Sequence, residues 1–277
     1  MFDPLGLITP FTIRVKCLIQ DLWSKKNPWG DPLPPHIEKE WKRCKKAYGA
    51  AIYLKSRTRN GISVKLVTSK SRVAPLNGVT LPRLELLGAL IAARLTSKVG
   101  KIVNSKRPCV QYRWTDSKIV IFWIKGSKTR GKQFVANRVN ETTSLTDPNS
   151  WYHCAGKENP ADLLSRGISA DCLVTSNTRW WTGAEFLSDP EFPENFQSID
   201  SDLDYLTENE RETVVLERKT NPETESSSET VLLSEDDSGF LDKLLDHSNN
   251  YFEVKVSEHV RSTFFLNCEI ETPKYVF

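Results

Sequence analysis

Apolar residues recur at helical spacing at the start of the chain. Ile13 and Cys17 lie four residues apart on an apolar stripe, which predicts a first helix over Thr9–Trp23. The prolines of residues 25–35 end this pattern and predict an extended connector, because proline has no N–H group to donate in a helix. A short helical run is predicted over residues 36–46.

The pattern then changes to one typical of β-strands. Ala47–Leu54 and Ile62–Val67 are rich in β-branched and aromatic residues, and each predicts a strand. The segment Arg59-Asn60-Gly61 between them is a turn signal, because Asn and Gly tolerate the backbone conformation that tight hairpins require. An antiparallel hairpin is therefore expected here.

Helices and strands alternate in the following hundred residues. Thr80 can cap a helix that has Pro82 in its first turn. The patterns after this helix predict a strand, two helices, a short strand and a short helix. These elements are Val110–Thr115, Ser117–Lys125, Phe134–Leu145, Trp151–Cys154 and Pro160–Gly167. This order predicts an α/β fold around a central sheet.

Regular patterning is lost after Trp181. Residues 185–238 are rich in Ser, Thr, Glu and Asp, which predicts an acidic disordered linker, because such a segment has too few apolar residues to bury. Residues 239–277 regain weak amphipathic patterns and predict a short helical C-terminal remnant.

Charge is distributed unevenly along the chain. Residues 1–181 contain 31 Lys or Arg and 12 Asp or Glu, whereas residues 182–250 contain 4 and 19. A basic folded part suits a nucleic acid, because each neutralised phosphate releases condensed counterions. A lysine-rich solvated surface is the alternative interpretation of the same charge.

Several protein classes are not indicated. Six scattered cysteines without a C-x-x-C pair suggest neither a zinc module nor a dense disulfide framework. No secretory signal and no apolar run of bilayer length is visible. A soluble intracellular location, in the cytoplasm or nucleus, is therefore expected, with no membrane partner.

Three carboxylates at the edges of predicted elements are the candidate chemistry. Glu85 lies near a helix start, Asp116 follows a strand and Asp162 lies near the start of another helix. Hard oxygen donors of this kind hold Mg²⁺ or Mn²⁺, so these three residues are the candidate catalytic and metal-ligating groups. Each also has a simpler interpretation. Glu85 and Asp162 would serve the helix dipole, and Asp116 would cap the next helix.

Seven segments, in order, carry a family resemblance. They include Leu-Pro-Arg-Leu-Glu-Leu around Glu85 and Trp-Thr-Asp-Ser around Asp116. All seven are residues 2–7, 47–51, 69–75, 81–86, 114–117, 134–139 and 156–167. They resemble the Bel/Pao class of LTR retrotransposon polyproteins, from the end of the reverse transcriptase into the ribonuclease H domain. The resemblance assigns residues 1–35 to the reverse transcriptase end and its connector, and residues 36–184 to a ribonuclease H-like domain.

This resemblance implies a ribonuclease H-like mixed sheet with flanking helices, which binds an RNA·DNA hybrid or duplex RNA. It also implies an acidic cluster, Asp, Glu, Asp and Asp in chain order, that holds two metal ions. Glu85, Asp116 and Asp162 would be its second, third and fourth members. One ion would activate water and the other would stabilise the leaving oxygen.

The first Asp of that cluster is missing. Related elements have it in a strand just before the segment that starts at Ala47, in a sequence resembling Asp-Ala-Ser, whereas this chain has cations over residues 42–46. Substitution would put Lys42 at the metal position, and deletion would join the connector directly to the second strand. We favour deletion, because no counterpart of the first strand precedes Ala47. The domain is therefore expected to be incomplete and to lack its first, central strand.

The predicted function is that of a retrotransposon-derived ribonuclease H-like fragment. It is related to metal-dependent hydrolysis of RNA in RNA·DNA hybrids, and it is expected to be catalytically impaired because a ligand is missing. The alternatives are a non-catalytic nucleic-acid-binding module and a decayed reading frame without selected function. Basic residues near the carboxylates are expected to contact phosphates. The candidates are Lys70, Arg72, Arg83, Lys125, Arg138 and Lys157.

Overall fold

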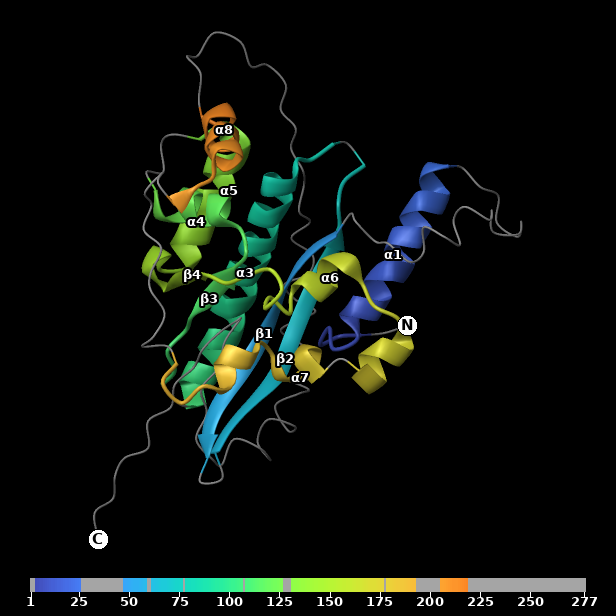
Figure 1. Cartoon of the computed structure of the whole chain (residues 1–277), viewed down its shortest axis with the longest axis vertical. Helices are drawn as coiled ribbons and strands as arrows, with labels where there is room; N and C mark the ends of the chain where they lie inside the picture. The colour runs from blue at the N-terminus through green and yellow to red at the C-terminus, as the bar shows by residue number, and fades with distance from the viewer. Residues whose placement is uncertain are drawn as a thin grey trace.

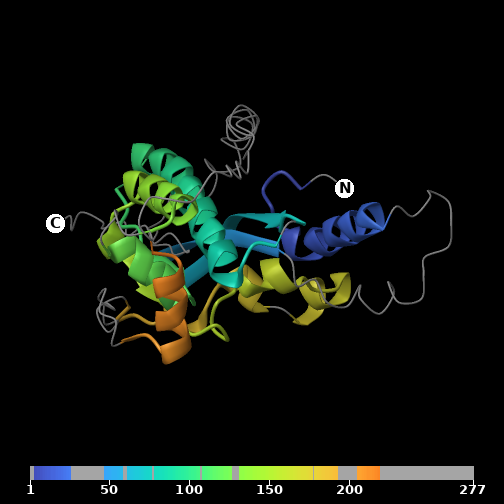
Figure 2. The same ribbon diagram turned by 90° about the horizontal axis from the view of Figure 1, so that it is seen from above.

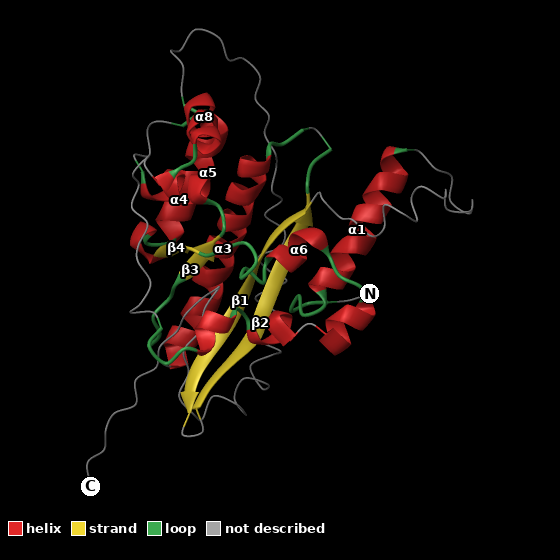
Figure 3. Cartoon of the chain, in the orientation of Figure 1, coloured by secondary structure: helices red, strands yellow, loops and turns green. Residues whose placement is uncertain are grey.

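A computed structural model describes residues 3–25, 47–58, 61–76, 78–106, 108–126, 131–176, 178–192 and 205–218. Helices surround a long β-hairpin, with a second, much shorter pair of strands beside it (Figures 1 and 3). The helices are α1 (Thr9–Ser24), α3 (Leu81–Lys106), α4 (Lys118–Lys125), α5 (Gln133–Leu145), α6 (Asp162–Arg166), α7 (Thr178–Thr182) and α8 (Glu208–Leu216). The strands are β1 (Ala47–Thr58), β2 (Gly61–Val73), β3 (Arg113–Thr115) and β4 (Trp151–His153). Short 3-10 or π-helical turns cover Pro148–Ser150, Cys172–Ser176 and Glu185–Ser188. The fold is therefore mixed α/β.

The first helix confirms its prediction. Asp3 accepts hydrogen bonds from the backbone N–H groups of Leu7 and Ile8 at 2.9 and 3.1 Å, just before α1 begins. Pro10 lies in the first turn, where the helix needs no donor from it. The predicted connector beyond Lys25 and the predicted helix over residues 36–46 lie outside the described residues.

The hairpin is also confirmed, and both strands run further than the patterns predicted. β1 and β2 pair antiparallel from Ala47 opposite Val73 to Thr58 opposite Gly61. Polar residues extend β1 because they find partners outside the hairpin. Lys55 donates from Nζ to the carbonyl of Asp189 at 2.7 Å, and its side chain is fully buried.

The long helix α3 packs against one face of β1. Leu86, Leu87 and Leu90 are almost fully buried on α3. A Cβ atom on Gly88 would lie 3.4 Å from the carbonyl oxygen of Gly49 in β1, so helix and strand approach closely at this point. The predicted helix after Thr80 is thus confirmed, and it rests directly on the hairpin.

The second sheet consists of two short parallel strands. Arg113 in β3 pairs with Trp151 in β4, and Thr115 pairs with His153. Trp114 and Trp151 are 1% and 0% exposed, so both belong to the core. β3 begins at Arg113 and is therefore shorter than the predicted strand from Val110.

The prediction of one central sheet is wrong for the part of the chain that the structure describes. β1 and β2 form one two-stranded sheet, and β3 and β4 form another. A single sheet needs a strand that bonds to both β1 and β3, and none lies there among the described residues.

Aromatic side chains connect the two sheets instead. The Phe192 ring lies 5.6 Å from the Trp114 ring of β3, and the Lys55 ammonium of β1 lies 4.8 Å from the Phe192 ring centroid. Phe186 adds a further contact with Trp114, at 5.0 Å between ring centroids. The segment after α7 therefore bridges sheets that share no backbone ladder.

The segment predicted as a disordered linker contains ordered structure. Residues 185–192 pack on the sheets, and α8 lies beside the helices α4 and α5 (Figures 1 and 2). A capping box at Thr207 and Glu210 starts α8, in which each residue satisfies a backbone or hydroxyl donor of the other. The linker prediction is therefore wrong for these residues, while the predicted C-terminal remnant lies outside the described ranges.

Two further observations concern disulfide-rich and membrane proteins, the classes that the sequence did not indicate. Cys17 and Cys109 each take part in a disulfide bond, which the cysteine spacing did not indicate, whereas Cys154 is a buried free thiol. Within the described residues, every helix is too short or too polar to cross a bilayer.

We expect Phe192→Ala to destabilise the protein by about 3–5 kcal/mol, because it removes a fully packed ring that joins both sheets. Urea denaturation followed by circular dichroism measures this change. Val215→Ala in α8 is the control, because Val215 is 56% exposed, and it should change stability by less than about 0.5 kcal/mol. Equal effects of the two substitutions would contradict the bridging role.

Candidate carboxylate site and basic surface

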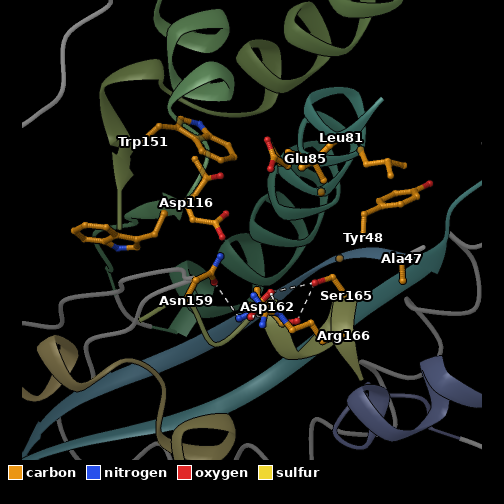
Figure 4. Close-up of a pocket in the computed structure, with 17 residues that line it drawn as sticks. Ala47, Tyr48, Leu81, Glu85, Asp116, Trp151, Asn159, Asp162, Ser165 and Arg166 are labelled. Carbon is orange, nitrogen blue, oxygen red and sulfur yellow. Dashed lines mark hydrogen bonds and ion pairs between the residues drawn. The ribbon is translucent and has the colours of Figure 1, made fainter. Parts of the chain in front are cut away.

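The structure brings all three predicted carboxylates to one cavity. The cavity has a volume of about 450 Å³ and lies between the start of β1, the first turns of α3, the end of β3 and α6. Glu85, Asp116 and Asp162 line it from three different elements (Figure 4). Glu85 and Asp162, which are 77 positions apart in the sequence, thus face the same cavity.

Asp116 is available to the cavity because its neighbour caps the helix. Ser117 is the N-cap of α4, and its hydroxyl oxygen accepts a hydrogen bond from the Val120 N–H at 3.3 Å. The interpretation of Asp116 as the cap is therefore wrong. Gly156 approaches from the other side, since a Cβ atom there would lie 3.3 Å from an Asp116 carboxylate oxygen.

Glu85 is not explained by the dipole of its helix. α3 begins at Leu81, so Glu85 lies beyond the first turn, and that turn contains no acidic residue. Its side chain extends toward the cavity and is hydrogen-bonded to the side chain of Ser117. The helix-dipole interpretation of Glu85 is therefore wrong.

Asp162 has an internal partner. It is the first residue of α6, and Arg166 one turn later donates to its carboxylate, with the shortest N–O distance at 2.7 Å. The dipole interpretation therefore fits Asp162, because an acidic residue in a first turn is stabilised there. The pair compensates one of the three charges in the cavity.

Burial raises the pKa of both Glu85 and Asp116. The negative charges of Asp116 and Glu210 raise the pKa of Glu85 further, against the hydrogen bond from Ser117. The charge of Asp162 likewise raises the pKa of Asp116, whose side chain is hydrogen-bonded to Asn159. Carboxylates that repel one another in a partly buried space favour a cation or a proton.

The carboxylate oxygens are donors of the type that divalent cations prefer, but the side chains are not arranged to coordinate such a cation. Over the described ranges, no group of three or more His, Cys, Asp or Glu side chains is placed to bind a metal ion. Asp162 is engaged by Arg166, and Glu85 and Asp116 alone supply only two side chains. As the residues stand, they do not fit the two-metal cluster that the resemblance implied.

Three of the six predicted basic residues converge beside this cavity. The guanidinium carbons of Arg83 and Arg138 lie 4.9 and 4.0 Å from the centroid of the Phe134 ring. Burial and the positive charge of Arg83 lower the pKa of Arg138. Burial raises the pKa of Tyr48, and the positive charges of Arg72 and Arg138 both oppose this increase. We call Arg72, Arg83 and Arg138 the arginine cluster.

The other three predicted basic residues lie on separate elements. Lys70 stands in β2 opposite Ala50. Lys125 is in the last turn of α4, 5.9 Å from the Tyr152 ring centroid. Lys157 is exposed in a turn, where its carbonyl accepts a hydrogen bond from Arg179.

Sequence reasoning missed several residues of this region. Arg94 of α3 forms an ion pair with Glu141 at 2.6 Å, and its positive charge also lowers the pKa of Tyr48. Glu217 pairs with Arg83, and no sequence signal pointed to it, because it follows α8 in the segment predicted to be disordered. The partner of Asp162 did have a signal, since Arg166 lies four residues later on the same helix face.

We expect Glu85→Gln to raise stability at neutral pH more than at pH about 4. A carboxyl group whose folded pKa is raised stabilises the fold while protonated, and this stabilisation is lost as the pH rises through the folded pKa. Below the unfolded value, about 4.3, the two side chains become nearly equivalent. Urea midpoints at both pH values measure the difference, with the exposed Asp171→Asn as control. A gain from Glu85→Gln that is equal at both pH values would contradict the assignment.

Comparison with known proteins shows which family the N-terminal part is similar to. Residues 1–47 and 43–117 match the model of the Pao retrotransposon-like RNaseH-like domain, and the matched part contains Glu85 and Asp116. No curated protein and no solved structure matches the chain. Over these first 117 residues, the chain is similar to this family, which supports its recognition as a Bel/Pao retrotransposon fragment with an RNase H-like domain.

Proposed function

We propose that this chain is an RNase H-like fragment that binds an RNA·DNA hybrid or duplex RNA and has lost most of its hydrolytic activity. The observation that carries the proposal is the division of the sheet around the carboxylate cavity. β1 and β3 line the same cavity from different sheets, and no described strand joins them.

The elements around the cavity support one position for the strand that we propose is missing. Ala47, Tyr48 and Gly49 at the start of β1 and Trp114 to Asp116 at the end of β3 line it. A strand between them would complete a sheet of order β2, β1, new strand, β3, β4, in which the family resemblance puts the first Asp. We propose that this strand was deleted.

The family match supports deletion rather than substitution. Its two segments overlap over residues 43–47, where β1 begins, so the similarity is divided at the position where the first strand is expected. A run of point substitutions would leave the length of this region unchanged. A division of the match at this position is the expected result when a stretch of chain is missing.

The carboxylates that remain are a poor basis for hydrolysis. Without the first Asp, the cavity has Glu85, Asp116 and an Asp162 that is paired with Arg166. Mg²⁺ needs several oxygen ligands in near-octahedral geometry, and two-metal hydrolysis needs both ions positioned. We therefore propose that the acids no longer support efficient cleavage.

The basic residues still suit a nucleic-acid backbone. The arginine cluster supplies guanidinium groups near Phe134, and such groups pair well with phosphate oxygens. An A-form duplex is recognised mainly through its shape, phosphates and 2′-hydroxyl groups, without reading of base edges. Binding that is independent of sequence is therefore expected.

A cleavage assay tests the loss of activity. The full chain, incubated with Mg²⁺ or Mn²⁺ and a labelled RNA·DNA hybrid, should release no more product than the buffer alone, because the ligand set is incomplete. Gel electrophoresis of the labelled RNA measures this. Robust cleavage that disappears in Asp116→Asn would show that the acids still form a working site.

A binding assay tests the basic surface. Arg138→Gln should weaken hybrid binding similarly for unrelated sequences and reduce the slope of log affinity against log salt by about 1, because one phosphate contact is lost. Fluorescence anisotropy over a series of salt concentrations measures both quantities. Lys101→Gln, on the exposed surface of α3, removes the same charge and is the control. Salt-insensitive binding, or none, would leave the decayed reading frame as the better interpretation.

A further inference from the structure

We infer that α8 with Glu217 is an internal acidic ligand of the arginine cluster, which competes with nucleic-acid phosphate for Arg83. This inference rests on the proposed function and adds regulation to it. α8 comes from the acidic part of the chain, and its sequence includes Glu208, Glu210 and Glu212 before Glu217.

The contact with Arg83 has the geometry of phosphate recognition. Arg83 donates from Nε to one carboxylate oxygen of Glu217 at 2.9 Å and from an Nη atom to the other at 3.1 Å. Arginine binds carboxylates and phosphates through this same fork of two parallel donors. A phosphate at Arg83 would need the same N–H groups, so the two ligands exclude each other.

The pair is largely removed from solvent. The side chains of Arg83 and Glu217 are 24% and 10% exposed. Such a pair is screened less by salt than an exposed one. A phosphate must therefore displace Glu217 to reach this guanidinium.

The backbone anchors the end of α8 at the same place. The carbonyl of Glu217 accepts a hydrogen bond from the Lys132 N–H at 2.7 Å, and Arg218 forms a β-bridge with Gly131. Both partners lie just before α5, which supplies Phe134 and Arg138 to the cluster. Glu217 is thus held over the starts of α3 and α5.

The charge of the acidic helix also influences residues at the carboxylate cavity. The charge of Glu210 acts on Glu85 and on His153, beside Asp116. The negative charge of α8 is therefore felt both at the arginine cluster and in the cavity, and it opposes an approaching phosphate backbone at both places.

The apolar attachment of α8 is small enough for release. Within α8 only Val214 is buried, while Val215 and Leu216 are 56% and 71% exposed. A short helix with few buried apolar contacts opens at a lower free-energy cost than the core. The ion pair and the backbone contacts thus provide much of what holds α8 in place.

A pair of matched substitutions in the full chain tests the competition. Glu217→Gln should tighten binding of a labelled RNA·DNA hybrid by about three- to tenfold and make its salt dependence steeper by about one unit of slope, because Arg83 becomes available. Glu212→Gln removes the same charge from an exposed position of the same helix and should change affinity much less. The double variant Arg83→Gln/Glu217→Gln should lose the gain.

Hydrogen exchange on the unmodified chain is a second readout that does not depend on a variant. Addition of the hybrid should reduce protection of the α8 amides, because the bound phosphate displaces Glu217. Unchanged or increased protection, or equal affinities of Glu217→Gln and Glu212→Gln, would overturn the inference. In that case, salt-dependent binding by the wild type would still support the proposed function. Absence of hybrid binding by every variant would overturn both.

Discussion

Side-chain packing between two separate small sheets is the constraint on which the rest of this structure depends. The edge of β1 that is not paired with β2 has no strand partner among the described residues, and an isolated two-stranded hairpin is only marginally stable in water. α3 covers one face of the hairpin, and the rings of Trp114, Phe186 and Phe192 connect it to β3 and β4. The carboxylate cavity lies in the region that this packing leaves between the two sheets.

The charged residues around the cavity between the two sheets are neutralised in different ways. Asp162 pairs with Arg166 and Arg83 pairs with Glu217, so a member of the acidic site and a member of the arginine cluster each have an internal counterion. Glu85 and Asp116 instead respond to burial with a raised pKa. Such an arrangement supports the proposal that this region binds a polyanion in competition with internal carboxylates and no longer positions two metal ions.

Local patterns predicted much of the fold and of the site. The hairpin, α1, α4 and α5 follow from periodicity, turn residues and caps, which act over a few positions. The three carboxylates were found because each stands at or near the boundary of a predicted element, although Ser117 and not Asp116 caps α4. The basic residues were less predictable. Arg83 and Arg138 meet at Phe134, but Lys157 lies elsewhere, because charge alone does not say which surface residues share a face.

By itself, the sequence determined the order and type of the elements, the resemblance to a retrotransposon RNase H-like domain and the identity of the candidate acids. Only the tertiary structure decided that the strands form two sheets, that Phe192 bridges them, and that an acidic helix meets the arginine cluster. Arg83 and Glu217 are 134 positions apart, and Lys55 and Asp189 are equally distant. Contacts of this range depend on how the whole chain packs, so no local period or motif contains them.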